Sequence, residues 1–344
     1  MNNQKHIAVI GGGIAGIETA AILANQNYKV TIIEKSDKTG GKLNDWNHLF
    51  PDFSEPEAVI SNIKWKSANA VADIIYNTEI TRIKKENSRF ELSDNSKNIK
   101  LFADAVVLTC GFNLFDASLK EEYGYGIFNN VITSADFEKR IKEGKGLKTA
   151  QGEYPKRIGI IHCVGSRDAK SGNTYCSKVC CITGIKQAIE INKIIPECEV
   201  YNFYMDLRLY GSTFDSLYLT AQQQHKIQFI RGRLSEVAEK NDKRLQIKAE
   251  DTLSGKPLRM DVDMVILLVG MEPCATREKL IEDNDVQLDS NGFFKSLNIH
   301  NERNNTTNEG IFMAGACICP MSVNDTIENA RSCALSVDNY LKNK

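Results

Sequence analysis

Apolar and polar positions near the N-terminus follow a strand, a helix and a second strand in turn. His6–Ile10 is an apolar run of strand length, a helix is expected to run from there to about Asn25, and Lys29–Ile33 is again a strand. The same order returns later in the chain, at Arg157–Cys163, about Cys181–Ile194 and Glu199–Asp206. Strands that alternate with helices predict an α/β fold, here with two Rossmann-like units of the dinucleotide-binding type.

The turn after the first strand holds Gly11, Gly13 and Gly16 in the pattern G-x-G-x-x-G. Glycines in this pattern allow a tight turn, let the backbone approach a pyrophosphate and permit close packing of helix on strand, while the helix N-terminus offers unpaired N–H groups to phosphates. The second strand ends in Glu34, eighteen residues after Gly16, where a carboxylate can accept from ribose hydroxyls. This order of elements predicts a dinucleotide site, and a turn that is merely tight is the alternative.

The residues after Glu34 indicate which dinucleotide binds. The segment KSDKTGGKL, with its Gly40–Gly41 pair, resembles FAD enzymes of the two-dinucleotide-domain disulfide reductase family. Two later segments are similar to that family as well: ADAVVLTCGF at 103–112 resembles the strand and turn that re-enter the FAD domain, and GIFMAGA at 310–316 resembles its closing strand. A helix that starts at Asn324 or Asp325 comes next, and its N-terminus is expected beside the flavin.

This resemblance implies a thioredoxin-reductase-like FAD/NAD(P)-binding architecture with a discontinuous FAD domain. The residues that it implies for FAD binding are Gly11, Gly13, Ala15, Gly16, Glu34, Lys35, Gly41, Lys42, Leu43, Ile80, Thr109, Cys110, Gly111, Gly315, Ala316, Asp325 and Thr326. The expected domains are residues 1–133 and 281–344 for FAD and residues 154–280 for the second unit. Ser134–Gln151, with a helix start at Ser134, is the predicted linker between them.

The second unit lacks the glycine pattern of a nicotinamide site. The turn after its first strand reads CVGSRD and holds only Gly165, so NAD(P)H binding there is not predicted. The segments IQFIRGRLSEV and RLQIKAED, together with the strand Met264–Gly270, are expected to complete its sheet.

Four cysteines occupy this second turn instead. Cys163 ends the strand, and Cys176, Cys180 and Cys181 follow with the spacing C-x12-C-x3-C-C at the start of the helix. A 4Fe-4S cluster needs four thiolates, and a helix N-terminus with Lys178 and Arg167 nearby favours thiolates and offsets the cluster charge. Buried cysteines that act as small apolar residues, and a structural zinc site, are the two alternatives.

Composition limits which binding partners and which cellular compartment are expected. Forty-three basic and 44 acidic residues leave a net charge of −1, which does not suggest nucleic acid or an anionic membrane as a partner. The longest apolar runs are of strand length, so no membrane span is expected. The N-terminus has no features of a signal peptide, so the chain is expected to be cytoplasmic, where ten cysteines favour metal binding or redox chemistry over structural disulfides.

The cysteine motif carries a second, closer resemblance. HCVGSRD followed by YCSKVCC is similar to the A subunit of heterodisulfide reductase and to the A subunit of quinone-interacting oxidoreductases, and EYGYGIFNNVITSADFE, FYMDLRLYG, FIRGRLSEV and LLVGMEP resemble further segments of that family in the same order. The resemblance implies that Cys163, Cys176, Cys180 and Cys181 hold a non-standard 4Fe-4S cluster near FAD. It also implies electron transfer to partner subunits, including Hdr-like B and C type subunits, and a homodimer.

The chain departs from the long members of that family. No cysteine lies between Met1 and Thr109, including the segment His48–Ile60, and no ferredoxin-type C-x2-C-x2-C-x3-C run occurs. The expectation is therefore the short, core-only form found in Hdr-like complexes of sulfur-oxidising prokaryotes, with a role in sulfur-compound oxidation.

Two other functions stay open from the residues alone. A self-contained NAD(P)H-dependent disulfide reductase would use a C-x-x-C pair, whereas three residues separate Cys176 from Cys180. A binding or scaffolding subunit could keep the flavin as structure. No histidine has the spacing of a catalytic base. The remaining cysteines are expected to be packed small residues, namely Cys110, Cys198, Cys274, Cys317, Cys319 and Cys333.

Overall fold

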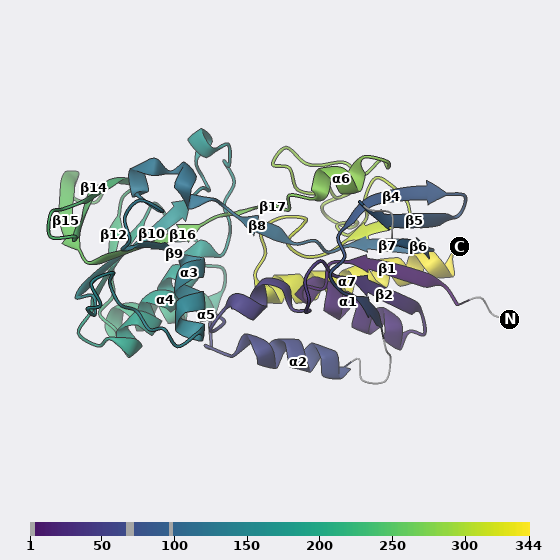
Figure 1. The fold of residues 1–344 in the computed structure, drawn as a ribbon, viewed down its shortest axis with the longest axis horizontal. Helices are drawn as coiled ribbons and strands as arrows, with labels where there is room; N and C mark the ends of the chain where they lie inside the picture. The colour runs from purple at the N-terminus through teal and green to yellow at the C-terminus, as the bar shows by residue number, and fades with distance from the viewer. Residues whose placement is uncertain (1–3, 67–71, 96–98) are drawn as a thin grey trace. The chain divides into compact units, whose positions relative to one another are not determined.

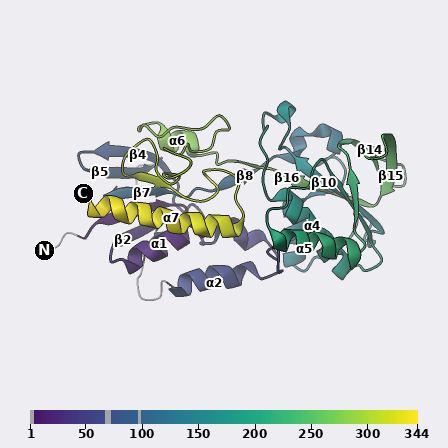
Figure 2. The same ribbon diagram turned by 180° about the vertical axis from the view of Figure 1, so that it is seen from behind.

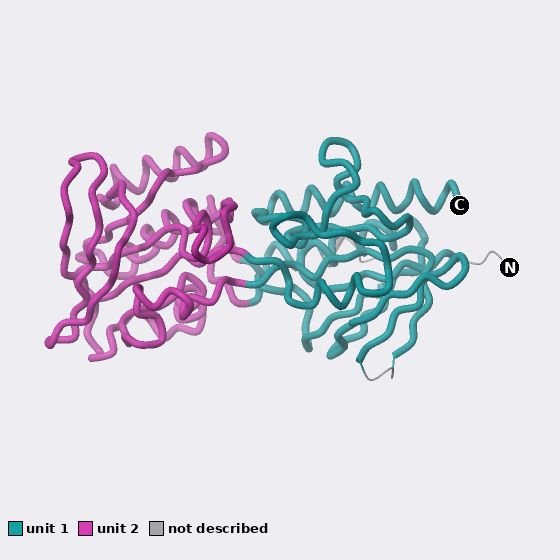
Figure 3. Tube along the Cα trace, turned by 90° about the horizontal axis from the view of Figure 1, so that it is seen from above, with its two compact units in different colours: residues 1–44, 56–113, 272–344 teal, residues 45–55, 114–271 magenta. Residues whose placement is uncertain are grey.

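The chain forms two compact units, each built around its own parallel sheet. The structure is a computed structural model that describes residues 4–66, 72–95 and 99–344. Unit 1 comprises residues 1–44, 56–113 and 272–344, and unit 2 comprises residues 45–55 and 114–271 (Figure 3). Each unit has helices on one face of the parallel sheet and a three-stranded antiparallel sheet on the other.

The sheet of unit 1 has five parallel strands in the order β18, β7, β1, β2, β3. Their bounds are Ile311–Met313, Ala105–Leu108, His6–Ile10, Lys29–Ile33 and Asp73–Ile75. The central strands β1 and β7 are buried along their whole length, which explains why they read as continuous apolar runs and not as alternating ones.

Helices α1 (Ile14–Asn25) and α7 (Val323–Lys342) lie side by side against one face of this sheet (Figures 1 and 2). Small side chains such as Ala20, Ala330 and Cys333 let them approach it closely. Helix α2 (Pro56–Lys66) lies beside α1. Helix α7 begins earlier than the expected Asn324 or Asp325, because Ser322 caps it and forms a capping box with Asp325.

The opposite face of the unit 1 sheet is covered by strands β4, β5 and β6, at Ile80–Glu86, Arg89–Asp94 and Lys100–Ala103. Their inward side chains, Ile83, Phe90 and Leu92, pack with Leu108 and Met313. The short helix α6 (Arg277–Ile281) lies against β4.

The sheet of unit 2 also has five parallel strands, in the order β12, β11, β10, β16, β9. Their bounds are Gln228–Arg231, Glu199–Tyr204, Arg157–Val164, Met264–Val269 and Val131–Thr133. Strand β9 precedes the predicted start of the second domain at residue 154. It pairs with β16, so the main segment of this compact unit runs from Leu114 to Met271, and a second segment is Asp45–Glu55.

The predicted linker Ser134–Gln151 belongs to the core of unit 2. Helix α3 (Ser134–Lys142) starts where the sequence indicates, with Thr133 as its N-cap in a capping box. Phe137 and Leu147 are fully buried in the helix layer that α3 forms with α4 (Cys180–Ile194) and α5 (Ser212–Gln223). A segment with two fully buried apolar side chains is part of a folded layer and not a solvated connection.

The other face of the unit 2 sheet carries strands β13, β14 and β15, at Leu234–Glu239, Leu245–Asp251 and Lys256–Val262. They form a separate antiparallel sheet. The expectation that RLSEV and RLQIKAED extend the parallel sheet is therefore wrong. Alternate residues of these strands, such as Leu245 and Ile247, are buried against Phe203 and Leu267 instead.

Two short strands, β8 (Phe112–Leu114) and β17 (Met271–Pro273), pair where the chain passes between the units. The described residues also form four short 3-10 helices, η1 to η4, at Gly41–Asp45, Ala117–Leu119, Glu121–Tyr123 and Ala169–Ser171. Within the described residues, no helix combines the length and the apolar character that a bilayer span requires.

Candidate functional site

The glycine turn of unit 1 brings strand β1, strand β7 and helix α1 into close contact. Gly11 has a positive φ of 110°, and a Cβ atom there would lie 2.5 Å from the carbonyl oxygen of Thr109. A Cβ atom on Gly16 would lie 2.0 Å from the carbonyl oxygen of Gly11. The Thr109 hydroxyl donates to the carbonyl oxygens of Ile10 and Gly11 at 2.9 and 2.8 Å. Only glycine fits at Gly11 and Gly16, as the motif predicts.

Gly13 differs, because a Cβ atom there would meet open space. It is the N-cap of α1, and no side chain within the described residues caps this helix. The first-turn N–H groups and the positive end of the helix dipole are therefore available to an anion. The Gly40–Gly41 segment lies beside this turn, with the N–H of Gly40 donating to the carbonyl oxygen of Gly12 at 2.8 Å.

Glu34 ends strand β2 beside the same turn and is buried. One carboxylate oxygen accepts from the backbone N–H of Gly12 at 2.5 Å. The other accepts from the N–H and the hydroxyl of Ser36 at 2.8 and 2.7 Å. These bonds fix the side chain, and each oxygen keeps acceptor capacity for a ribose hydroxyl.

The later predicted residues reach the same edge of the sheet, because Thr109 and Gly315 both follow the carboxyl ends of parallel strands. A Cβ atom on Gly315 would lie 2.7 Å from the Cβ atom of Ala15, and its N–H donates to the side chain of Asn329 at 2.8 Å. Gly111 has a φ of 67° and faces open space. In open parallel sheets, ligands bind at this edge.

The other predicted FAD residues have varied surroundings. Leu43, Ile80, Ala316 and Thr326 are buried, and Lys35 is exposed. The Nζ atom of Lys42 lies 5.2 Å from the centre of the Phe112 ring, and Cys110 has its sulfur 2.8 Å from that of Cys274. Asp325 serves the capping box of α7, where its carboxylate accepts from the N–H of Ser322 at 2.8 Å.

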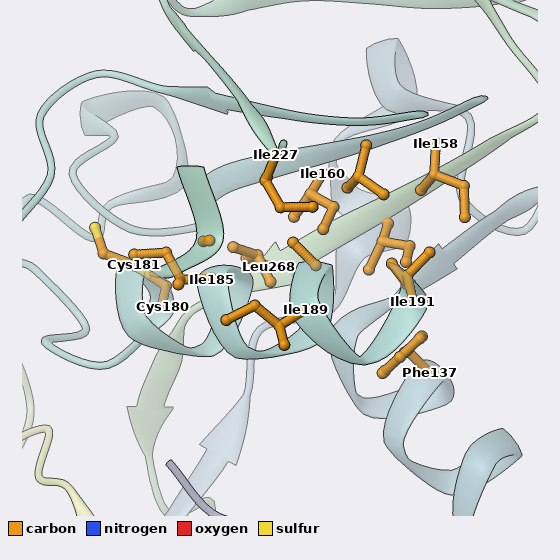
Figure 4. Packing of buried hydrophobic residues seen from close by; sticks show 14 of the residues in the cluster. Phe137, Ile158, Ile160, Cys180, Cys181, Ile185, Ile189, Ile191, Ile227 and Leu268 are labelled. Atoms are coloured by element: carbon orange, nitrogen blue, oxygen red, sulfur yellow. The ribbon is translucent and has the colours of Figure 1, made fainter. Parts of the chain in front are cut away.

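The second candidate site lies in unit 2, where strand β10 ends and helix α4 begins. Cys163 has a left-handed backbone with a φ of 60°, and Cys180 and Cys181 form the first turn of α4. Figure 4 shows these two cysteines at one end of the apolar cluster that follows α4 to Ile191. Cys163, Cys180 and Cys181 belong to one buried cluster, and His162 directly precedes Cys163 on strand β10.

These contacts favour thiolates at two of the three positions. The hydrogen bond from Cys180 lowers the pKa of Cys163 to about 7. The same donor lowers the pKa of Cys181 to about 4, and His162 adds to this effect. The pKa of Cys180 itself rises well above its ordinary value, because its neighbours Cys163 and Cys181 favour the protonated form and its sulfur is buried. A thiol at a helix N-terminus next to a cation has this character.

The structure thus brings together three of the four predicted ligands, Cys163, Cys180 and Cys181. Cys176 accepts a hydrogen bond from the backbone N–H of Lys178 at 3.3 Å, and among the described residues no hydrogen bond joins it to the other three sulfur atoms. No group of three or more His, Cys, Asp or Glu side chains in the described part of the chain is arranged to hold a metal ion. The 4Fe-4S cluster therefore stays a prediction.

His162 and Asn202 are site residues that the sequence analysis missed. The Nε2 atom of His162 lies 2.8 Å from the side-chain oxygen of Asn202. Burial lowers the pKa of His162, but its interactions with Cys181, Asn202 and Cys163 together outweigh this and raise the pKa overall. The only signal in the sequence is the place of His162 next to Cys163 at the end of a buried strand.

The loop after β10 explains much of the HCVGSRD motif. A Cβ atom on Gly165 would lie 2.0 Å from the ring of Phe115, so an aromatic side chain fills this turn where a nicotinamide domain would admit a pyrophosphate. Arg167 donates to the carboxylate of Asp206 at 2.7 Å, and its positive charge lowers the pKa of Cys163. Its positive charge thus lies beside the sulfur cluster.

Asp168 closes this loop, and its ion pairs are expected to make stability depend on pH. Its buried carboxylate is 2.8 Å from the Nζ atom of Lys120 and 3.0 Å from the Nη2 atom of Arg233. Burial raises its pKa, but these hydrogen bonds dominate and lower the pKa to about 2 from an ordinary 3.8. Because the pKa of Asp168 is lower in the folded chain than in the unfolded one, the ionised carboxylate stabilises the fold by about 2 kcal/mol at pH values well above the unfolded pKa. This stabilisation is lost as the pH falls towards 2.

We therefore expect Asp168→Asn to lower the free energy of unfolding near pH 6 and the difference from the original chain to shrink between pH 5 and 3. Urea unfolding at several pH values measures this. Asp242→Asn is the matched control, because Asp242 pairs with Arg244 on the surface of the same unit. An Asp168→Asn deficit that stays constant down to pH 3 would contradict the ion-pair argument.

Comparison with known proteins identifies the class. The family model described as pyridine nucleotide-disulphide oxidoreductase matches residues 5–334, and the chain belongs to this family. Thioredoxin reductase from T. acidophilum superposes with a TM-score of 0.68 at 20% identity, covering 99% of both chains. The predicted fold with two dinucleotide-binding-type domains is thereby confirmed.

Within that class, the similar curated proteins are A subunits of heterodisulfide reductases. The iron-sulfur A subunit of the CoB–CoM heterodisulfide reductase of Methanocaldococcus jannaschii is 31% identical, over 97% of this chain and 64% of that protein. The A subunit of the H2/formate:CoB–CoM heterodisulfide,ferredoxin reductase of Methanococcus maripaludis is 30% identical with the same coverage. The resemblance drawn from HCVGSRD and YCSKVCC is confirmed. This chain spans less than two thirds of the length of these relatives.

Proposed function

We propose that this chain is the FAD- and 4Fe-4S-containing electron-transfer subunit of a heterodisulfide-reductase-like complex. The observation that carries the proposal is that Cys163, Cys180 and Cys181 lie in one buried cluster at the N-terminus of α4. A nicotinamide-binding domain would have a phosphate-binding turn there, and here Phe115 fills the turn. The name of the M. jannaschii relative, an iron-sulfur subunit, supports the same assignment.

The residues of unit 1 fit FAD. Gly13 and Gly111 leave open space at the carboxyl edge of the sheet, and the uncapped N-terminus of α1 suits a pyrophosphate. Glu34 is held where a ribose hydroxyl can donate to it. FAD exchanges electrons in pairs or singly and a 4Fe-4S cluster exchanges them singly, so the two together allow a two-electron donor to serve one-electron acceptors.

In this proposal, residues of the chain offset the negative charge of the cluster and keep water away from its ligands. Arg167 and the dipole of α4 lie beside the sulfur atoms, where they offset the negative charge of a cluster. Cys176 would complete the ligand set from the segment just before α4. Cys163 and Cys180 are buried, so the ligand shell excludes solvent and influences the reduction potential.

The proposal also covers the partner subunits and the cellular compartment. We infer Hdr-like B and C type subunits as electron-transfer partners, a homodimer, and a cytoplasmic role in sulfur-compound oxidation. The heterodisulfide reductase names of the relatives support the complex. All ten cysteines are unpaired, which agrees with a reducing compartment.

The test is the content of iron, acid-labile sulfide and FAD in protein purified without oxygen. We expect about four iron and four sulfide per FAD, lost in the double variant Cys180→Ser, Cys181→Ser while FAD stays bound. Cys198→Ser is the matched control, because Cys198 is a buried cysteine of the same unit that lies outside the group. FAD without iron or zinc in the original chain would refute the cluster, and bleaching of the flavin by NADPH would favour a self-contained disulfide reductase.

A further inference from the structure

Unit 1 contains a second group of cysteines that the proposed cluster does not use. Cys110 lies just after strand β7 and Cys274 directly follows strand β17, 164 positions later in the sequence. Their sulfur atoms are 2.8 Å apart. Cys317, in the segment after β18, belongs to the same buried cluster as Cys274.

We propose that Cys110 and Cys274 form a reversible disulfide, which gives unit 1 a two-electron dithiol centre that reacts with small disulfides. A disulfide bond is about 2.05 Å long, so the two sulfur atoms need to approach by less than about 1 Å. Both positions are held by the core, since β7 is buried along its whole length and Cys274 is itself buried. The pair is thus already close to bonding distance without a change of fold.

The neighbouring sulfur atoms are engaged elsewhere. The thiol of Cys317 donates to the carbonyl oxygens of Leu108 and Ala314 at 3.3 and 3.2 Å. Cys319 accepts a hydrogen bond from Arg303 at 3.1 Å. The close pair that remains is Cys110 and Cys274, and a dithiol is the chemistry that this geometry supports.

The reaction balances with a disulfide RSSR as the oxidant. The half-buried Cys110 thiolate attacks one sulfur of RSSR, one RS⁻ leaves, and a mixed disulfide forms. The Cys274 thiolate then attacks the sulfur of Cys110 and releases the second RS⁻. The two protons of the protein thiols end on the two RSH molecules, and the two electrons of the dithiol reduce RSSR.

The expected rate of oxidation depends on Arg277 and on the pKa values of Cys110 and Cys274. Arg277 donates to the carbonyl oxygen of Cys274 at 3.0 Å and places a positive charge near its sulfur. The hydrogen bond with Cys110, and then burial, nevertheless raise the pKa of Cys274. For Cys110, the hydrogen bond from Cys274 lowers the pKa, but contact with Cys317 and burial outweigh it. Oxidation should therefore quicken by about tenfold per pH unit between pH 7 and 9.

The disulfide would join the points at which the chain leaves and re-enters unit 1. Cys110 lies just before β8 and Cys274 just after β17, the two strands that pair at this passage. Cys110 also lies between Thr109 and Gly111, both candidate FAD residues. The centre is nevertheless independent of the proposed cluster, since the two share no cysteine.

The experiment treats the purified full chain with 2-hydroxyethyl disulfide, alkylates the remaining thiols in denaturant and maps tryptic peptides by mass spectrometry. The three cysteines of interest fall in separate peptides, at 101–120, 260–277 and 304–331. We expect a linked pair of the first two peptides, the loss of two alkylatable thiols, and full reversal by dithiothreitol. This readout needs no variant and no activity.

Variants then assign the partners. Cys110→Ser and Cys274→Ser should each abolish the link, whereas Cys317→Ser should keep it. Cys333→Ser is the matched control, since Cys333 is a fully buried cysteine of the same unit in α7. Recovery of Cys110 and Cys274 as alkylated thiols, a mixed disulfide that persists on Cys110, or a link from peptide 101–120 to peptide 304–331 would each overturn the proposal.

Discussion

Replacement of Lys186 by methionine is expected to lower the free energy of unfolding by about 3–5 kcal/mol. Lys186 lies in α4, and only 2% of its side chain is exposed. Its ammonium group is 2.5 Å from the carboxylate of Glu138 in α3 and 3.0 Å from that of Glu190. Methionine has a similar size, so the change removes a charge and leaves two buried carboxylates without a cation.

The network around Lys186 also explains why the segment Asp45–Glu55 belongs to unit 2 although unit 1 residues flank it in the sequence. The backbone of Asn47 donates to Glu138 at 3.1 Å, and the carbonyl oxygen of His48 accepts from Lys186 at 3.1 Å. The His48 ring lies 2.7 Å from Glu190. Loss of Lys186 therefore removes contacts to three parts of the unit at once.

Urea unfolding followed by circular dichroism measures this effect. Lys145→Met is the matched control, because Lys145 pairs with Glu143 on the surface of the same unit and should change stability by less than about 1 kcal/mol. The double variant Lys186→Met, Glu138→Gln should regain part of the loss, because it leaves one buried carboxylate and not two. A Lys186→Met loss no larger than that of Lys145→Met would show that the network is not important for folding.

The elements that local sequence governs were predicted closely. Helix α1 ends at Asn25 and strand β2 covers Lys29–Ile33, as the pattern indicates, because a glycine turn and a short apolar run specify both. The glycine turn of the FAD site and the cysteines of α4 were found for the same reason. Each is a short motif whose chemistry depends on neighbours in the sequence.

Features that depend on distant partners were not predictable. Strand β9 belongs to unit 2 because it pairs with β16, more than one hundred residues away, and its own sequence fits either unit. The pairing of Cys110 with Cys274 joins positions 164 apart, and no local pattern marks it. His162 likewise lies beside α4, 2.9 Å from where a Cβ atom of Gly184 would be, only because β10 and α4 pack together.

Two glycines of the first turn should separate folding from cofactor binding, and this is the sharpest test of the FAD site. Gly16→Ala places a methyl group 2.0 Å from the carbonyl oxygen of Gly11 and 2.9 Å from the Thr109 hydroxyl. Alanine favours a helix over glycine by about 1 kcal/mol, but forcing α1 away from β1 and β7 costs about 3 kcal/mol. We expect a net loss of about 2 kcal/mol of stability together with loss of FAD.

Gly13→Ala is the matched variant. Gly13 has a φ of −69°, which alanine also adopts, and apart from its chain neighbours no described residue lies within 4 Å of the new methyl group. The stability of this variant should change by less than about 0.5 kcal/mol. Alanine is a poorer N-cap than glycine, which lowers stability, but it also restricts the unfolded chain, which raises stability by a similar amount. The methyl group would nevertheless occupy the space that a pyrophosphate needs, so FAD affinity should fall at least tenfold.

Urea unfolding of the apoproteins and titration of each with FAD, followed by flavin fluorescence, give the two quantities separately. A stable Gly13→Ala chain that binds FAD as tightly as the original would mean that the open space at Gly13 is not the pyrophosphate site. If both variants lost stability equally, packing alone would explain the motif. The predicted split, with stability lost at Gly16 and affinity lost at Gly13, ties the turn to a bound dinucleotide, because packing does not explain a loss of affinity at a position where, among the described residues, the methyl group meets nothing beyond its chain neighbours.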